Sequence, residues 1–185
     1  DGYESDRARL CVYELRTGKK TYVTEGFDSG VDAFLWSPDS KRLYFAGVWH
    51  GKVNLHVADL KGKLRQITDA PADYSLVSLL PGEKQLLVKR RSLSRPDEIY
   101  TVDVKNGRVA QLTEENKWFY DHLAWGDVKE RWTKTVDGKD MLSWVIYPPH
   151  FDPSKKYPTL LFCEGGPQSP VSQFWSYRWN FQIMA

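Results

Sequence analysis

Residues 54–68, NLHVADLKGKLRQIT, decide the fold, because the same pattern occurs twice more in the chain. Each copy predicts a strand, a turn ending in glycine, a second strand and a closing threonine. The other copies are residues 9–24 (RLCVYELRTGKKTYVT) and residues 98–113 (EIYTVDVKNGRVAQLT). The turn glycines are Gly18, Gly62 and Gly107, spaced 44 and 45 residues apart, and the threonines Thr24, Thr68 and Thr113 each follow six residues later. Glycine suits these turns because a tight hairpin needs a residue at positive φ.

A second repeated pair lies between the hairpins. WSPD at residues 36–39 precedes one strand-like run, and LPGE at residues 80–83 precedes another. Self-similarity at this period, with four short strands in each unit, indicates the blades of a β-propeller. We predict complete blades at residues 32–69 and 73–114, the last two strands of an earlier blade at residues 1–28, and one further strand at residues 119–126. We expect no helix longer than two turns before residue 126.

The repeat ends after residue 126. Residues 131–136 (RWTKTV) and 141–147 (MLSWVIY) predict two strands around a turn at Asp137-Gly138. The short apolar run at residues 158–163 (PTLLFC) is typical of a strand buried on both faces. Residues 173–185 are rich in aromatic side chains, and we expect a helix near their end.

Four motifs follow one another in the last third of the chain: VDG at 136–138, IYPP at 146–149, FDPSKKYP at 151–158 and GGPQS at 165–169. In this order they resemble the start of the α/β-hydrolase domain in the prolyl oligopeptidase family of serine peptidases. The likeness is to the dipeptidyl peptidase and acylaminoacyl peptidase branches. The resemblance implies a mainly β chain with two parts. Residues 1–126 would be the last blades of a partial β-propeller, with antiparallel four-stranded blades, and residues 127–185 the truncated beginning of an α/β-hydrolase domain.

The same resemblance implies a place in acyl transfer for the glycine pair. A tetrahedral oxyanion needs preorganised donors, and a backbone N–H in the loop after the third hydrolase strand supplies one. Gly165 and Gly166 are the oxyanion-loop candidates, and Gly166 is the better candidate for the donor. Relatives often place His or Tyr before this pair, whereas Glu164 stands here, and its carboxylate would repel an oxyanion. From the residues alone, a tight strand-to-loop turn remains the alternative.

The sequence contains no G-x-S-x-G motif, so none of the catalytic Ser, Asp and His residues of the family is expected within it. We interpret the four histidines as structural: His50, His56, His122 and His150. Asp59 and Asp103 recur just before hairpin turns, where their side chains are expected to stabilise the turn. No spacing typical of metal ligands occurs, and neither a metal nor a cofactor is expected.

Charge and composition narrow the choice of partners. With 26 basic and 24 acidic residues, the chain gives no electrostatic case for nucleic acid. The basic run at residues 89–91 (KRR) predicts a solvated strand end rather than a phosphate site. Cys11 and Cys163 lie in apolar runs, so we expect buried free thiols. No stretch is apolar enough over 18 residues to span a membrane.

We therefore expect part of a serine exopeptidase, a dipeptidyl peptidase that acts on short peptides, with the chain alone inactive. The alternative is a TolB-like propeller for protein binding, which leaves KKYPTLLFCEGGPQS at residues 155–169 unexplained. Bare apolar faces around residues 160–162 and 174–175 predict self-association or pairing with the rest of the full-length protein. The first residues, DGYE, show no signal peptide. A bacterial dipeptidyl peptidase would be periplasmic or secreted, and the protein would otherwise be cytoplasmic.

Overall fold

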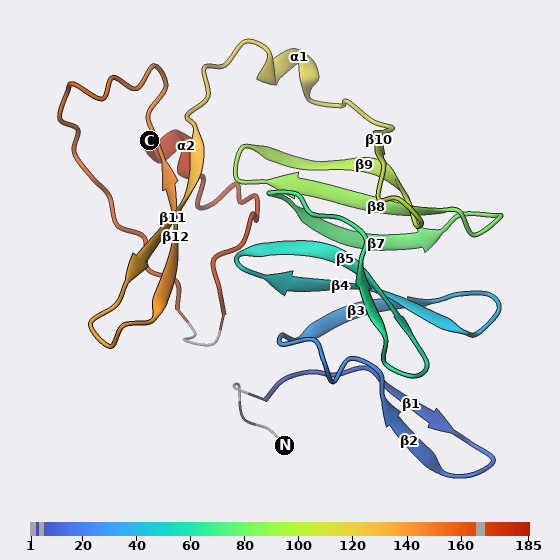
Figure 1. Cartoon of the computed structure of the whole chain (residues 1–185). Helices are drawn as coiled ribbons and strands as arrows, with labels where there is room; N and C mark the ends of the chain where they lie inside the picture. Colours follow the sequence, from blue (N-terminus) through green and yellow to red (C-terminus); the bar gives the residue numbers. More distant parts are fainter. Residues whose placement is uncertain (1–2, 4–5, 166–168) are drawn as a thin grey trace.

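A computed structural model describes residue 3, residues 6–165 and residues 169–185 of the chain. Strands dominate it, as expected, and the sheets do not close into a ring (Figure 1). The first hairpin consists of β1 (Cys11–Glu14) and β2 (Lys19–Tyr22). It lies beside the first complete blade, which has the predicted position in the sequence.

Two antiparallel blades follow, as the repeat predicted. The first consists of β3 (Val31–Trp36), β4 (Arg42–Trp49), β5 (Lys52–Asp59) and β6 (Leu64–Gln66). The second consists of β7 (Asp73–Leu79), β8 (Gln85–Ser92), β9 (Arg95–Asp103) and β10 (Val109–Gln111). A parallel bridge between Val53 and Asp73 joins the two blades where β5 and β7 begin.

The closing threonines explain why the repeat has its particular spacing. In each hairpin the threonine Oγ1 accepts a hydrogen bond from a backbone N–H at the start of the hairpin, at 2.9 Å in every case. The three donor–acceptor pairs are Leu10 with Thr24, Leu55 with Thr68, and Ile99 with Thr113. Each threonine therefore provides a hydrogen-bond acceptor for a backbone N–H that lies beyond the last pair of the two strands. A backbone N–H inside a protein needs such a partner.

The aspartates before the turns act as predicted. The Asp59 carboxylate accepts hydrogen bonds from the backbone N–H groups of Lys61 and Lys63, at 2.8 and 2.9 Å. Asp103 likewise accepts from Lys105 and Asn106, at 2.9 Å each. These backbone donors hold the pKa of both carboxyl groups below its ordinary value.

Apolar side chains fill the space between neighbouring units. One buried cluster joins the two blades and includes Tyr44, Leu55, Tyr74, Leu86 and Val102. A second joins the first hairpin to the first blade and includes Val23, Phe27, Leu43, Phe45 and Ala58. Each blade thus buries its face against the next one, as repeat proteins do.

The segment after the blades differs from the prediction at residues 119–126. They form no strand; instead α1 (Lys117–Tyr120) is a single helical turn. Lys117 Nζ lies 2.8 Å from Asp121 Oδ2, an i,i+4 ion pair that favours helix over strand. Trp125 then folds back, and its indole Nε1–H donates to the Tyr120 carbonyl at 3.1 Å. The expectation of no long helix before residue 126 holds for the described residues.

The hairpin after residue 126 is confirmed. It consists of β11 (Val128–Lys134) and β12 (Asp140–Ile146), with Gly138 at a φ of 80° in the turn. The chain ends in α2 (Phe181–Met184), the helix expected near the terminus. No helix in the described part of the chain is long and apolar enough to cross a membrane.

Two predictions about residues 158–163 are wrong. The run forms no strand, and Leu160 and Leu161 are 75% and 86% exposed. A strand depends on a hydrogen-bonded neighbour, and no described strand pairs with this run. Cys163 is therefore exposed rather than buried, and so is Cys11, which lies on the mostly exposed strand β1.

The buried histidine of the first blade predicts a pH-dependent stability. His56 is 7% exposed, and its ring lies 4.9 Å from that of Phe27 and 5.2 Å from that of Phe45. Burial lowers the pKa of His56 below its ordinary value of 6.5. The unfolded chain therefore binds a proton more tightly at this side chain, so stability is lost as the pH falls below 6.5 and through the lower pKa of the folded state.

We expect His56→Gln to make the unfolding free energy less dependent on pH in this acidic range. Urea unfolding at a series of pH values measures it. His122→Gln makes the same substitution at an exposed histidine and serves as the control. Identical slopes for wild type and His56→Gln would contradict the assignment.

Candidate functional site

The chain after residue 126 returns to one end of the blades. In Figure 1 the β11–β12 hairpin and the C-terminal segment (residues 169–185) lie beside the turns that join β4 to β5 and β8 to β9. The hairpin meets the first of these turns directly. The His50 ring lies 5.1 Å from the Trp132 ring, and Lys52 forms an ion pair with Glu130.

The turn between β4 and β5 needs glycine for two reasons. Gly51 has a φ of +68°, and a Cβ there would lie 2.9 Å from Leu142 Cδ2 and 3.0 Å from the Val171 carbonyl oxygen. The Trp144 indole N–H donates to the same Val171 carbonyl at 3.0 Å. The blade turn, the hairpin and the C-terminal segment therefore meet within van der Waals distance at this point.

Asp73, the first residue of β7, is the central polar group of this junction. It is 3% exposed. Its Oδ1 accepts from the backbone N–H groups of Val53 and Gln173, each at 3.1 Å, and its Oδ2 accepts from Ser172 Oγ–H at 2.7 Å. Arg91 Nε lies 3.9 Å from Oδ2. Burial raises the pKa of Asp73, and the bond from Ser172 opposes that rise.

Two glutamines of the C-terminal segment complete the junction. Gln173 is 2% exposed, and its Oε1 accepts from the Leu93 backbone N–H at 3.3 Å. Gln182 Oε1 accepts from the Gly126 backbone N–H at 2.9 Å. Gln182 Nε2 donates to the Gly126 carbonyl at 3.1 Å and to Ser94 Oγ at 2.9 Å. Both side chains thus tie the segment to the turn between β8 and β9.

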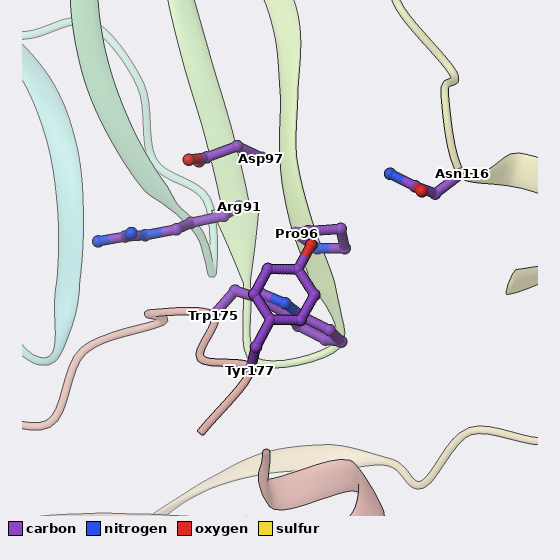
Figure 2. Close-up of a pocket in the computed structure, with 6 residues that line it drawn as sticks. All are labelled: Arg91, Pro96, Asp97, Asn116, Trp175 and Tyr177. Carbon is purple, nitrogen blue, oxygen red and sulfur yellow. The ribbon is translucent and has the colours of Figure 1, made fainter. Parts of the chain in front are cut away.

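A cavity of about 290 Å³ opens beside this junction. Figure 2 shows its lining: Arg91, Pro96, Asp97, Asn116, Trp175 and Tyr177. The Trp175 and Tyr177 ring centroids are 5.8 Å apart, and Arg91 extends away from them in the figure. The cavity therefore has aromatic walls from the C-terminal segment and charged walls from β8 and β9.

The basic run at residues 89–91 lies on β8 next to this cavity. Its side chains interact with groups of their own blade. The Arg90 guanidinium lies over the Tyr74 and Tyr100 rings, at 5.7 and 5.4 Å, and Lys89 Nζ is 3.7 Å from Asp97 Oδ2. These partners account for the run without a bound phosphate.

The oxyanion-loop candidates precede the C-terminal segment, and Gly165 lies eight residues before Gln173. Glu164 and Gly165 are exposed, and a Cβ on Gly165 would meet nothing within 4 Å, so its backbone is open to approach. Gly166 lies outside the described residues. Just before the loop, the Phe162 ring lies 5.0 Å from the Phe181 ring of α2 and 6.1 Å from the Trp179 ring. The loop thus has an aromatic contact before it and the Asp73 contacts after it.

The sequence did not predict the polar junction around Asp73. Asp73 follows DAPA at residues 69–72, a composition typical of a loop, so its burial gave no signal. Ser172 and Gln173 could have been noticed only as polar residues next to the apolar pair Phe174-Trp175. In the described residues no cluster of three His, Cys, Asp or Glu side chains is placed to hold a metal ion.

Sequence comparison relates the whole chain to curated peptidases. It is 49% identical, over 100% of its length, to dipeptidyl-peptidase 5 of Porphyromonas gingivalis, and it spans 27% of that protein. It is 45% identical to dipeptidyl-peptidase 5 of Porphyromonas endodontalis and 33% identical to that of Aspergillus fumigatus, and spans 27% and 25% of them. The chain therefore spans about a quarter of the length of these relatives. No family model matches it.

Solved structures share the fold. An acylaminoacyl peptidase of Pyrococcus horikoshii superposes on 80% of the chain with a TM-score of 0.66, at 22% identity and over 22% of its own length. Dipeptidyl peptidase 4 of Porphyromonas gingivalis superposes on 84% of the chain with a TM-score of 0.59, at 15% identity and over 23% of its length. Both superpositions extend beyond the blades into the segment after residue 126, because the blades alone would not reach this coverage.

Proposed function

The chain belongs to the prolyl oligopeptidase family of serine peptidases, and from that premise we propose that the full-length protein is a dipeptidyl peptidase. It would release dipeptides from the free N-termini of oligopeptides. The observation that supports this most is the 49% identity to a dipeptidyl-peptidase 5 over the entire chain, the segment after the blades included. A TolB-like binding propeller would have no use for that segment.

In this proposal residues 1–126 are the last propeller blades and residues 127–185 begin the hydrolase domain. The reaction is acyl transfer. A serine oxygen from the rest of the protein attacks the carbonyl carbon of the second substrate residue, and negative charge develops on the carbonyl oxygen. The amine then leaves with a proton, and water releases the dipeptide from the acyl-enzyme.

The role of this chain is to hold a donor where that charge develops. The backbone N–H of Gly166 is our candidate, and the backbone of Gly165 beside it is open, since a Cβ there would meet nothing within 4 Å. Loss of a single oxyanion donor typically lowers kcat by roughly 10²–10³-fold. Glu164, whose side chain is exposed, is assigned no part in the reaction.

A pair of chromogenic substrates tests the proposal on the full-length protein. One carries a dipeptide with a free amine, and the other a single N-acetylated residue. We expect release from the dipeptide substrate only. Release from the acetylated residue alone would assign the acylaminoacyl branch instead, and a protein that cleaves neither would favour a binding propeller.

A further inference from the structure

We infer that Asp73 is a positioning residue for the peptidase reaction, because its buried carboxylate fixes the chain immediately after the oxyanion loop. The inference rests on the proposed function. Asp73 belongs to the propeller blade, whereas Ser172 and Gln173 belong to the segment that follows the loop. One side chain therefore connects the blade to the part of the chain that presents the candidate donor.

The buried Asp73 side chain connects the first blade to residues 172–173 through hydrogen bonds. Three hydrogen bonds of 2.7–3.1 Å reach its two oxygens, one from its neighbouring blade and two from residues 172–173. At 3% exposure the carboxylate is desolvated, and such a group is retained only where donors replace the lost water. Arg91, at 3.9 Å, adds a positive charge from β8.

The position of these contacts along the chain links them to the loop. Gln173 lies eight residues after Gly165. Between them, the Val171 carbonyl is held by the Trp144 indole at 3.0 Å. On the other side of the loop, the Phe162 ring packs against the Phe181 and Trp179 rings, and Phe162 is 39% exposed. Among the described residues, the junction at Asp73 is therefore the firmer of the two attachments that flank the loop.

Removing the carboxylate leaves donors without acceptors. In Asp73→Ala, the Gln173 and Val53 N–H groups and the Ser172 hydroxyl all lose their partner in a buried site. Asp73→Asn keeps one oxygen for the two backbone donors and presents an amide to Ser172 Oγ, which can accept. The conservative variant should therefore retain part of the function that alanine abolishes.

The kinetic test uses the full-length protein, with active sites counted by fluorophosphonate titration so that misfolded molecules do not enter kcat. We expect Asp73→Ala to lower kcat by roughly 10–100-fold with little change in KM, because misplacing a catalytic element by about 1 Å has an effect of that size. Asp73→Asn should recover much of the loss. Asp140→Asn alters an exposed carboxylate on β12 whose partner is Lys134 Nζ, at 2.8 Å, and it should match wild type.

Hydrogen exchange on the 185-residue chain tests the junction without any activity. In Asp73→Ala the Gln173 amide should exchange roughly tenfold faster or more, as expected for a lost buried hydrogen bond. Amides of β8 and β9 should keep their protection, which shows that the blade remains folded. Ser172→Ala provides a milder variant that removes one bond only.

The outcomes separate the two claims. An active wild-type protein in which Asp73→Ala keeps its kcat per active site overturns the positioning role alone. Equal kcat losses in Asp73→Ala and Asp140→Asn do the same. A wild-type protein that cleaves no peptide substrate overturns the proposed function, and an unchanged Gln173 exchange rate overturns the junction itself.

Discussion

The 185-residue chain by itself is expected to cleave no dipeptidyl substrate and to take up no fluorophosphonate. Its sequence contains no G-x-S-x-G motif, so we expect the family's serine, aspartate and histidine to lie outside it. A site that keeps oxyanion donors without the triad retains only a residual 10³–10⁴-fold acceleration over water, on the order of what subtilisin-type variants show. Peptide hydrolysis at that level is undetectable in an ordinary assay.

Intact mass after incubation with the fluorophosphonate measures the labelling, and a chromogenic dipeptide measures turnover. A chain boiled before incubation provides the background. Labelling of the folded chain above that background, or turnover above buffer, would mean that a nucleophile lies within residues 1–185.

Gly107→Ala is expected to destabilise the blades more than the matched substitution Gly82→Ala. Both glycines lie in hairpin turns at positive φ, +73° and +84°. A Cβ on Gly107 would lie 2.1 Å from the Ile67 carbonyl oxygen of the preceding blade, whereas a Cβ on Gly82 would meet nothing within 4 Å. The overlap involves backbone, so the second blade must move away from the first.

The left-handed conformation costs each alanine about 1–2 kcal/mol, and Gly82→Ala should lose about that much. Gly107→Ala should lose about 1–3 kcal/mol more, the usual cost of forcing atoms into a packed site. Urea unfolding of both variants measures the difference. Equal losses would contradict the close approach of the Gly107 turn to the Ile67 carbonyl. Gly62→Ala, whose Cβ would be 3.6 Å from the Val23 carbonyl, should resemble Gly82→Ala.

The blades were predictable because their determinants are local. Each hairpin contains its own turn aspartate or glycine and its own closing threonine, so a fixed spacing in the sequence produces the same hydrogen bonds in space. The strand expected at residues 158–163 failed for the opposite reason. An apolar run becomes a strand only beside a partner, and no described segment pairs with it.

The junction at Asp73 shows why part of the candidate site could not be predicted. Its partners lie 99 and 100 residues away in the sequence, so no local pattern connects them. The glycine pair at residues 165–166 was found only through its resemblance to a family motif. Its assigned role is a prediction, because Gly165 is exposed at a bend and Gly166 lies outside the described residues.

The central claim is that this chain supplies the propeller blades and oxyanion loop of a serine dipeptidyl peptidase. Fluorophosphonate labelling of the full-length protein, followed by peptide mapping, tests it most directly. The account predicts one labelled serine, outside the 185 residues of this sequence, and loss of dipeptide release in proportion to labelling. A labelled serine within these residues, or dipeptide release that persists after complete labelling, would contradict it.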